Sequence, residues 1–516
     1  MKHLTLKLSV AACLLSSAGA FAQSPDTAVF GRIRRAELSS SQIPQIAHYL
    51  TDVAGPRLTA SPGYKRAATW AVETMTKWGL TNAKLEPWGD FGKQWDLQDF
   101  SIIMKTPYIQ PVMAYPKPWS ASTNGLQQGQ VVVISPQQAM DTIYIAQHLA
   151  DFKGKFVLIT GGKLNTEAGF KPASERLSDE ELANLKDTYM VSHKEIEQYA
   201  GYFKIMAKAD VLTKQAGALG MITTSPSNNY GTVFVQDMGQ KLTSPLSVPK
   251  LTMAYEDGQK IKRLIQSGHI VELAINIVAK TLTDDIKGYN VVAEIPGTDP
   301  KLKSQLVMLG GHLDSWTAAT GATDNAAGCI VMMEAVRLLD SLGLKPKRTI
   351  RIALWDGEEQ GVFGSYNYAK NHFMSVDYKL KPEQAKVSAY FNLDNGSGKI
   401  RGIFTQGNTA IHPIFEKWFE PFHDLGAKTV TDKNTGSTDH LSFDWAGIPG
   451  FQFIQDPLDY ETKTHHSNQD NYDHLQMDDL KQAAIIIASF VYQTSVEKDM
   501  MPRKPLVKEI FAFDGL

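Results

Sequence analysis

Near its start the chain carries apolar residues at the spacing of helix faces. Between residues 41 and 53 they recur every three or four positions, which is the period of an amphipathic helix. A second such stretch follows Ser61, a residue suited to cap a helix, and Pro62, a residue suited to its first turn, and it stops at Gly79. The pattern predicts two helices, over residues 41–53 and 61–78.

From about residue 106 to residue 284 the pattern changes to short runs of β-branched and other apolar residues. Such runs, bounded by turn residues, are typical of strands. A polar stretch rich in charged residues, from Ser178 to Gly217, lies among them and predicts a helix. We therefore expect residues 106–284 to form a separate, inserted α/β module. Its strands are predicted at Val131–Ser135, Lys155–Gly161, Leu219–Thr224 and Val271–Val278.

After Gly288 nearly continuous apolar strands alternate with helical patterns. Strands without an exposed polar face are buried on both sides, as in a parallel sheet covered by helices. This part therefore predicts an α/β fold with a mostly parallel, twisted sheet and helices on both faces. The strands are expected at Leu306–Gly311, Thr349–Asp356, Val387–Asp394 and Ile448–Ile454, and the helices at Ala326–Leu342, Thr409–Leu425 and Asp478–Val496.

The first 22 residues have the pattern of a signal peptide. Lys2 and Lys7 give a positive start, an apolar run follows, and Ala20-Phe21-Ala22 fits a cleavage site. A periplasmic or secreted protein is therefore expected. Cys13 loosely fits a lipoprotein box, but the apolar run continues past it, which favours ordinary cleavage. The mature chain would then divide into one unit of residues 23–105 and 285–516 and the insert of residues 106–284.

Composition excludes several partners. With 43% hydrophobic and 21% charged residues and a net charge of −2, the chain lacks the basic footprint of a nucleic-acid-binding protein. Beyond the signal peptide the longest apolar run, Ala483–Val491, is about half of what a membrane span requires. Neither nucleic acid nor a membrane span is expected.

Residues of metal-binding types stand at the carboxyl ends of the predicted strands. His312 and Asp314 follow the first strand, Glu358 and Glu359 the second, and Asp394 ends the third. Ligands of open α/β sheets bind beyond these strand ends. One such residue alone is more often structural, but their coincidence on several strands indicates a site.

The residue types suit a pair of zinc ions. Two zinc ions need about four protein ligands and one carboxylate that bridges them. The available carboxylates are Asp324, Glu359 and Asp394, and the imidazoles are His312 and one of His465 or His466. In the His-x-Asp pair, Asp314 is placed to orient the His312 ring. One of the adjacent glutamates, at 358 or 359, can bind metal while the other serves as the general base.

Several motifs in this order resemble one family. GPRLTASPGYKRAATW near the start, DFKGKFVLITG and KQAGALGMI in the insert, and YNVVAEIPGTDPKLKSQLVMLGGHLDSW before the site are similar to segments of the co-catalytic zinc peptidases. That family includes bacterial leucyl aminopeptidases, glutamate carboxypeptidase and, nearest to this chain, carboxypeptidase Q. The resemblance implies a zinc peptidase catalytic domain over residues 23–105 and 285–516. It also implies that residues 106–284 form a protease-associated domain.

The resemblance also implies a division of roles. His312 and Asp394 would hold the first zinc, Glu359 and His466 the second, and Asp324 would bridge them, with Glu358 as the catalytic base. His466 is preferred to His465 because it matches the family spacing His-Ser-x-x-Asp. A cis peptide between Asp324 and Asn325 is implied as well. Asn325 stands where some relatives have a second aspartate, a change expected to leave metal binding intact.

Two further residues are candidates for substrate contact. His465 is expected to line the pocket. The run STDHLSF from Ser437 resembles a family segment near the substrate, and its His440 is a candidate contact for the scissile carbonyl or the substrate terminus. Trp316 could line the pocket or pack, and Cys329 lies on an apolar helix and is expected to be a core residue.

These observations predict a secreted zinc-dependent exopeptidase that hydrolyses short peptides or dipeptides with a metal-activated water. The insert is expected to cover the carboxyl edge of the main sheet and to narrow the approach to the metals. Aminopeptidase, carboxypeptidase and dipeptidase action remain open, as does the preference for side chains. Two alternatives are a catalytically inactive binding relative and a glutaminyl-cyclase-like acyltransferase with one zinc. Since relatives are often dimers, a homodimer is also open.

Overall fold

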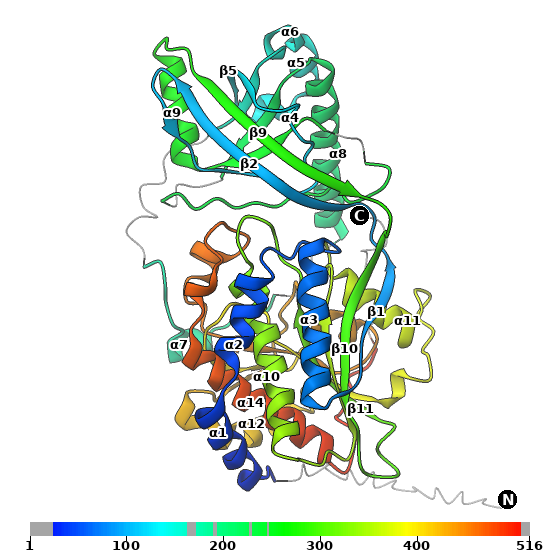
Figure 1. Cartoon of the computed structure of the whole chain (residues 1–516). Coiled ribbons are helices and arrows are strands. Elements are labelled where there is room, and N and C mark those ends of the chain that lie inside the picture. The colour runs from blue at the N-terminus through cyan, green and yellow to red at the C-terminus, as the bar shows by residue number, and fades with distance from the viewer. Residues whose placement is uncertain (1–23, 162–171, 189–192, 226–229, 245–246, 507–516) are drawn as a thin grey trace, which may run out of the picture.

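Two eight-stranded sheets, one in each lobe of Figure 1, organise the chain. The computed structural model describes residues 24–161, 172–188, 193–225, 230–244 and 247–506. The signal peptide expected at residues 1–22, with Cys13, lies outside these ranges. We call the lobe that carries the expected metal ligands the main lobe, and the other the second lobe.

The sheet of the main lobe is parallel in its centre, antiparallel on the side of β1, and on the other side has one antiparallel pair followed by the parallel edge pair β14–β15. The pairs β12–β11, β11–β13 and β13–β16 are parallel, whereas β1–β10, β10–β12 and β14–β16 are antiparallel. The expected α/β fold is confirmed, and its sheet is mixed because strands that lead to and from the second lobe join one side. In spatial order the strands are β1 (Thr81–Asp90), β10 (Lys287–Ile295), β12 (Thr349–Trp355), β11 (Leu306–His312), β13 (Val387–Asn392), β16 (Gly450–Gln455), β14 (Ile400–Phe404) and β15 (Thr429–Thr431).

Helices cover both faces of this sheet, as the apolar strands predict. On the central strand β11, Val307 and Leu309 point into one core while Met308 points into another, which is the alternation of a strand buried on both sides. The first core is closed by the helices ranged along the front of Figure 1, namely α1 (Thr27–Ser40), α2 (Ile43–His48) with η1 (Tyr49–Val53), α3 (Pro62–Trp78), α10 (Ala327–Ser341) and α14 (Met477–Val496). The second core is closed by α11 (Phe363–His372) and α13 (His440–Trp445).

The expected N-terminal helices are present, with one addition. Ser61 caps α3 by accepting a hydrogen bond from the Tyr64 amide, and Gly79 ends it in a left-handed conformation at φ 103°. The addition is α1, whose apolar face is short: Val29, Phe30 and Ile33 are buried among charged neighbours. That weak pattern is why the sequence did not predict it. The helix expected over 409–425 is divided into α12 (His412–Phe419) and a tighter turn, η5 (Glu420–Leu425).

The second lobe is built on the other sheet. Its long strands β2 and β9 pair antiparallel along most of their length, and both cross the lobe diagonally in Figure 1. Since β2 precedes residue 106, a division drawn from the sheet would begin this lobe near Gln94. The strand order is β3 (Gln110–Pro111), β2 (Gln94–Thr106), β9 (Glu272–Leu282), β5 (Gln127–Ile134), β6 (Phe156–Ile159), β7 (Gly220–Thr224), β8 (Lys250–Met253) and β4 (Ala114–Pro116), with helices α4 (Pro136–Met140), α5 (Thr142–Gln147), α6 (Leu149–Phe152), α8 (His193–Gln215) and α9 (Tyr255–Gln266).

The polar stretch expected to be one helical region, residues 178–217, is divided between the lobes. Its first helix, α7 (Asp179–Ala183), lies against the main lobe, whereas α8 belongs to the second lobe (Figure 1). The contact before α7 is ionic: the Arg176 guanidinium lies 2.8 Å from Asp456 and 2.7 Å from Asp479. Within the described ranges, every helix is too short or too polar to cross a membrane.

Candidate metal centre

The expected metal ligands converge because their strands are neighbours. His312 ends β11, Glu358 and Glu359 follow β12, and Asp394 follows β13. These parallel strands lie side by side, so their carboxyl ends meet at one edge. Two further segments complete the group. Asp324 lies in the irregular turn η3 (Ala322–Ala326), and His466 lies in the loop after η6 (Tyr460–Thr464).

Asp324 stands between two pairs of residues, with one carboxylate oxygen toward each. Its Oδ1 atom is 3.2 Å from His312 Nε2, and that nitrogen is also 3.2 Å from Asp394 Oδ1. Its Oδ2 atom is 3.2 Å from His466 Nε2, which is 2.9 Å from Glu359 Oε2. Each pair contains one imidazole and one carboxylate, as in a two-metal site with a bridging aspartate.

Two of the candidate ligands have buried oxygen atoms that make no hydrogen bond, and three of them could share one metal ion. In the described part of the chain, Asp324 Oδ2 and Glu359 Oε1 are buried and have no hydrogen-bond partner. Buried polar atoms are normally paired, so unpaired ones need an explanation. His312, Asp324 and Glu359 each offer a ligand atom, and these atoms all lie within 4.8 Å of one another. A group of nitrogen and oxygen atoms this close together could hold a metal ion.

The raised pKa values of two carboxyl groups also indicate a place for cations. Burial, with the neighbouring Asp394, raises the pKa of Glu358 well above its usual value. Burial and the charge of Asp324 raise the pKa of Glu359 to about 7. Carboxylates crowded together out of water disfavour their charged forms. Divalent cations among them would restore the ionised state by supplying opposite charge.

The two adjacent glutamates point in different directions. Glu359 is directed at His466, whereas the Oε2 atom of Glu358 is 4.0 Å from His312 Nε2 and its side chain is 12% exposed. The turn that separates them is held by Asp314, whose carboxylate accepts hydrogen bonds from the Glu358 amide at 3.2 Å and from the Glu359 amide at 3.4 Å. The Thr59 hydroxyl donates to the same carboxylate at 2.8 Å.

Asp314 contacts His312 mainly through its main chain. His312 Nδ1 lies 3.0 Å from the Asp314 carbonyl oxygen and 3.5 Å from the Asp314 carboxylate. The sequence pattern predicts orientation of the ring by the carboxylate. In the structure the carbonyl is the nearer partner, and the carboxylate instead fixes the glutamate turn.

Asp470 has a supporting role that sequence reasoning did not assign. Its carboxylate accepts hydrogen bonds from the Thr323 amide at 2.6 Å, the Thr323 hydroxyl at 2.8 Å and the Asp324 amide at 3.0 Å. The Asp324–Asn325 peptide is cis, as expected. The Asn325 side chain donates to the Leu393 carbonyl and accepts from the Gly328 amide, so its polar atoms are engaged with the backbone.

The two weaker candidates lie in different environments. His465 is 37% exposed, its Nε2 atom is 3.9 Å from Asp324 Oδ2, and its ring centroid is 3.8 Å from that of His466. His440 is fully buried, and its Nε2 atom lies 2.8 Å from Gln406 Nε2 and 3.0 Å from the Thr435 carbonyl oxygen. Burial lowers the pKa of His440 to about 4. Contact of either ring with substrate stays a prediction.

Asp439 is a buried acid of this region that the sequence did not single out. It is fully buried, and burial raises its pKa to about 8, with Asp394 contributing. Its neighbours His440 and Thr438 drew attention through the motif, but nothing in the sequence indicates that the aspartate is buried. Trp316, whose role was open, is buried and lies edge-on to His466 at 6.0 Å between ring centroids.

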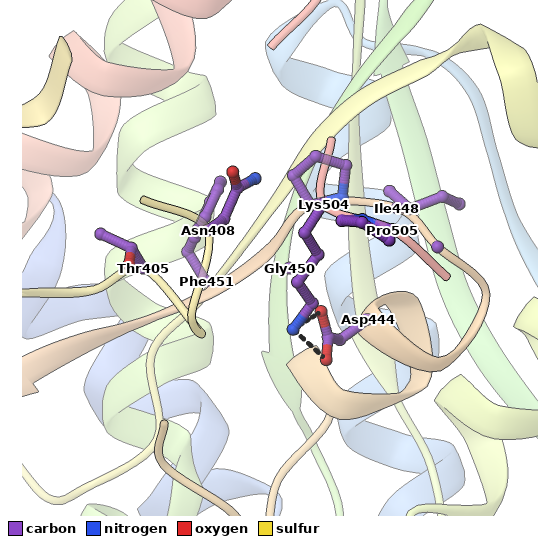
Figure 2. A pocket seen from close by; sticks show the side chains of 10 residues that line it. Thr405, Asn408, Asp444, Ile448, Gly450, Phe451, Lys504 and Pro505 are labelled. Carbon is purple, nitrogen blue, oxygen red and sulfur yellow. Dashed lines mark hydrogen bonds and ion pairs between the residues drawn. The ribbon is translucent and has the colours of Figure 1, made fainter. Parts of the chain in front are cut away.

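A small cavity beside Asp444 and Lys504 is lined by none of the candidate metal ligands. Figure 2 shows Lys504 reaching Asp444 across it, and Lys504 also donates to the Gln406 carbonyl. The cavity has a volume of about 10 Å³, which is room for about one water molecule. It is therefore too small to admit a peptide.

Comparison with known proteins places this geometry in context. Residues 290–491 match the sequence profile of peptidase family M28. Carboxypeptidase Q of Homo sapiens is 25% identical over 463 residues, which are 88% of this chain and 85% of that protein. Leupeptin-inactivating enzyme 1 of Streptomyces exfoliatus is 34% identical over 164 residues, 31% of this chain and 34% of that protein.

Solved structures show the same fold. A peptidase M28 precursor from Shewanella amazonensis has a TM-score of 0.66 at 23% identity, over 93% of this chain and 98% of that one. A zinc aminopeptidase from Bacillus subtilis has a TM-score of 0.55 at 20% identity, over 88% and 94%. Both likenesses extend across the two lobes described here.

The role of Asp314 can be tested with Asp314→Asn. The amide keeps the shape but replaces one of the two carboxylate oxygens with an NH2 donor. Since the Glu358 and Glu359 amides donate to different oxygens, one of them loses its acceptor. We expect kcat/KM for a short peptide to fall about 10–100-fold, the usual effect of disturbing a residue that supports metal ligands. Thr59→Val is the milder control, because it removes one donor and keeps the carboxylate. Wild-type activity in Asp314→Asn would contradict this role.

Proposed function

We propose that this protein is a di-zinc exopeptidase acting on short peptides, because residues 290–491 match the sequence profile of peptidase family M28. The observation that carries the proposal is the position of Asp324, whose two oxygens each face a separate imidazole–carboxylate pair. A single metal ion would be bound by only one of these pairs, and the other imidazole and carboxylate would bind no metal. The geometry therefore favours two zinc ions over the one expected of a glutaminyl-cyclase-like acyltransferase.

The proposed ligands follow from the two pairs. His312 and Asp394 would hold one zinc, His466 and Glu359 the other, and Asp324 would bridge them. Imidazole nitrogen and carboxylate oxygen are ordinary zinc ligands, and open coordination positions are typical of catalytic sites. Zinc bound here would polarise the peptide carbonyl and lower the pKa of a water molecule.

The chain's own residues carry out the proton transfers. Glu358 is close to the ligands but directed away from the second pair, so its carboxylate is free to act as the base. It would take the proton of the water that attacks the carbonyl carbon. As the C–N bond breaks, it would return that proton to the leaving nitrogen. Asp314, by fixing the Glu358 amide, keeps this carboxylate in position.

The second lobe supports a preference for short peptides. Its residues 231–235 lie against the loop that carries His466, at the carboxyl edge of the main sheet. A lobe in contact with this loop narrows the approach to the metals. Likeness to carboxypeptidase Q extends over 88% of the chain, whereas leucine aminopeptidase 2 of Trichophyton equinum matches 39%. Because a zinc aminopeptidase from Bacillus subtilis also covers 88% of the chain, these likenesses support exopeptidase action without ranking dipeptidase above aminopeptidase action.

The proposal also covers the second lobe, the location of the protein and the alternative of an inactive relative. Residues 106–284 would be a protease-associated domain, since their sequence motifs resemble one and most of them build the second sheet. The protein would be periplasmic or secreted, on the strength of the signal-peptide pattern at residues 1–22. The inactive alternative is disfavoured because all five ligands and the base are present.

The two glutamates give the sharpest test of the mechanism. Glu358→Gln should keep two zinc ions but lower kcat on the order of 10²–10⁴-fold, because the amide takes no proton. Glu359→Ala should lose activity and about half of the bound zinc, since it removes a ligand. Kinetics and elemental analysis on the same preparations separate these effects. Near-normal turnover of zinc-loaded Glu358→Gln would show that another group is the base.

Metal removal tests the cofactor. Stripping the protein with a chelator should abolish hydrolysis, and added zinc should restore it. The stripped protein should also unfold at a lower temperature, because a ligand that binds only the folded state stabilises it. Elemental analysis should find two zinc ions per chain. One zinc ion, together with cyclisation of an N-terminal glutamine peptide, would support the acyltransferase instead.

Substrate length and free termini can be tested with a peptide panel. Free dipeptides and tripeptides, the same peptides blocked at one end in turn, and a long peptide blocked at both ends should be offered to the enzyme. Hydrolysis of free short peptides is expected, and the block that stops it identifies the terminus recognised. Rapid internal cleavage of the doubly blocked peptide would contradict exopeptidase action.

A further inference from the structure

A short segment of the second lobe lies along the loop that carries His466. We call residues 231–235 the docking segment. Phe234 and Ser467 form an antiparallel bridge. On one side of it the Val235 amide donates to the His466 carbonyl at 2.8 Å, and on the other the Asn468 amide donates to the Val233 carbonyl at 3.1 Å. A residue from the second lobe thus bonds directly to the main chain of a candidate metal ligand.

The side chain of Asn468 fastens the same contact. Its Oδ1 atom accepts a hydrogen bond from the Val233 amide at 2.7 Å, and its Nδ2 atom donates to the Gly231 carbonyl at 3.3 Å. The docking segment is itself anchored, since Val233 and Val235 are fully buried and pack with Ala254 of the second lobe. The loop is therefore bonded to a segment that packs in a small buried cluster with Ala254 at the start of α9, and this cluster also contacts Ala318 of the main lobe.

The backbone of His466 needs such support. Its φ angle is 59°, in the left-handed region that residues with side chains rarely adopt. Such a conformation persists only where the surroundings enforce it. The Val235 hydrogen bond fixes the His466 carbonyl, and hence the conformation in which the ring faces Asp324 and Glu359.

We propose that the docking segment is a positioning element for one of the two zinc positions. This rests on the proposed function. Docking of residues 231–235 holds His466 in place and raises the affinity of the position formed by His466 and Glu359. The other position depends on His312 and Asp394, which the strands of the main sheet place themselves. Because coupling between two binding events is reciprocal, zinc at the position formed by His466 and Glu359 in turn stabilises the docked segment.

Asn468→Ala and Asn434→Ala form a matched pair for the test. The Asn434 side chain also bonds to a segment distant in the sequence, since its Nδ2 atom donates to Asp187 at 3.1 Å. This contact does not involve the His466 loop. The chelator-stripped proteins should be titrated with zinc in competition with a chromogenic chelator. We expect Asn468→Ala to weaken one of two sites about 10–100-fold, as for other groups that support ligands. The position formed by His312 and Asp394, and both positions in Asn434→Ala, should keep wild-type affinity.

The outcomes separate the two proposals. Two wild-type affinities in Asn468→Ala would overturn the positioning role and leave the di-zinc site intact. Failure of the wild-type chain to bind two zinc ions would overturn the proposed function instead. Equal weakening of both sites would also contradict the inference, because a general loss of stability does not distinguish the two positions.

Hydrogen exchange tests the reciprocal effect in the unaltered chain. Zinc should slow exchange of the Val235 amide in the wild-type protein. The bound ion would hold His466 and so stabilise the hydrogen bond from this amide to the His466 carbonyl. In Glu359→Ala, which lacks a ligand of that position, zinc should slow this amide much less. Equal exchange of the Val235 amide with and without zinc in the wild-type chain would overturn the coupling.

Discussion

The placement of the Asp324 carboxylate is the constraint on which the rest of the site depends. One oxygen faces His312 and the other faces His466, so a small rotation would misalign both pairs at once. Its backbone is held by the Asp470 carboxylate. The loop before it is held by the buried Arg57 guanidinium, which donates to the carbonyls of Leu313 and Gly321. Asp470 and Arg57 thus hold the backbone that carries the Asp324 side chain.

That network also explains how so many acids are accommodated out of water. Buried carboxylates are costly unless hydrogen bonds or cations compensate them. Asp470 and Asp314 are compensated by backbone amides and hydroxyl groups, because their task is structural. Asp324 and Glu359 instead retain buried oxygens without a hydrogen bond. Among these four acids, the unpaired oxygens belong to the two candidate metal ligands.

The convergence of the metal-ligand candidates could be predicted because local pattern and topology agree there. Buried parallel strands place their carboxyl ends together, so His312, Glu359 and Asp394 could be grouped before any contact was known. Features that depend on distant contacts were not predictable in this way. The burial of Asp439 and the pairing of Phe234 with Ser467 carry no periodic signal. The long strand β2 was missed because its polar, partly exposed residues lack the apolar run used to identify strands.

The two zinc positions proposed here differ in how their ligands are supported. His312 ends a central strand and is fixed by the sheet, whereas His466 lies in a loop whose main chain is bonded to the second lobe. A lobe that must stay docked to hold a ligand does not act as a freely opening lid, because its departure would release that ligand. Substrate must then reach the metals while both lobes remain in contact. Under the proposed function, such a fixed approach would select short, flexible chains with a free end, and the architecture that positions the second metal would also limit what the protein cleaves.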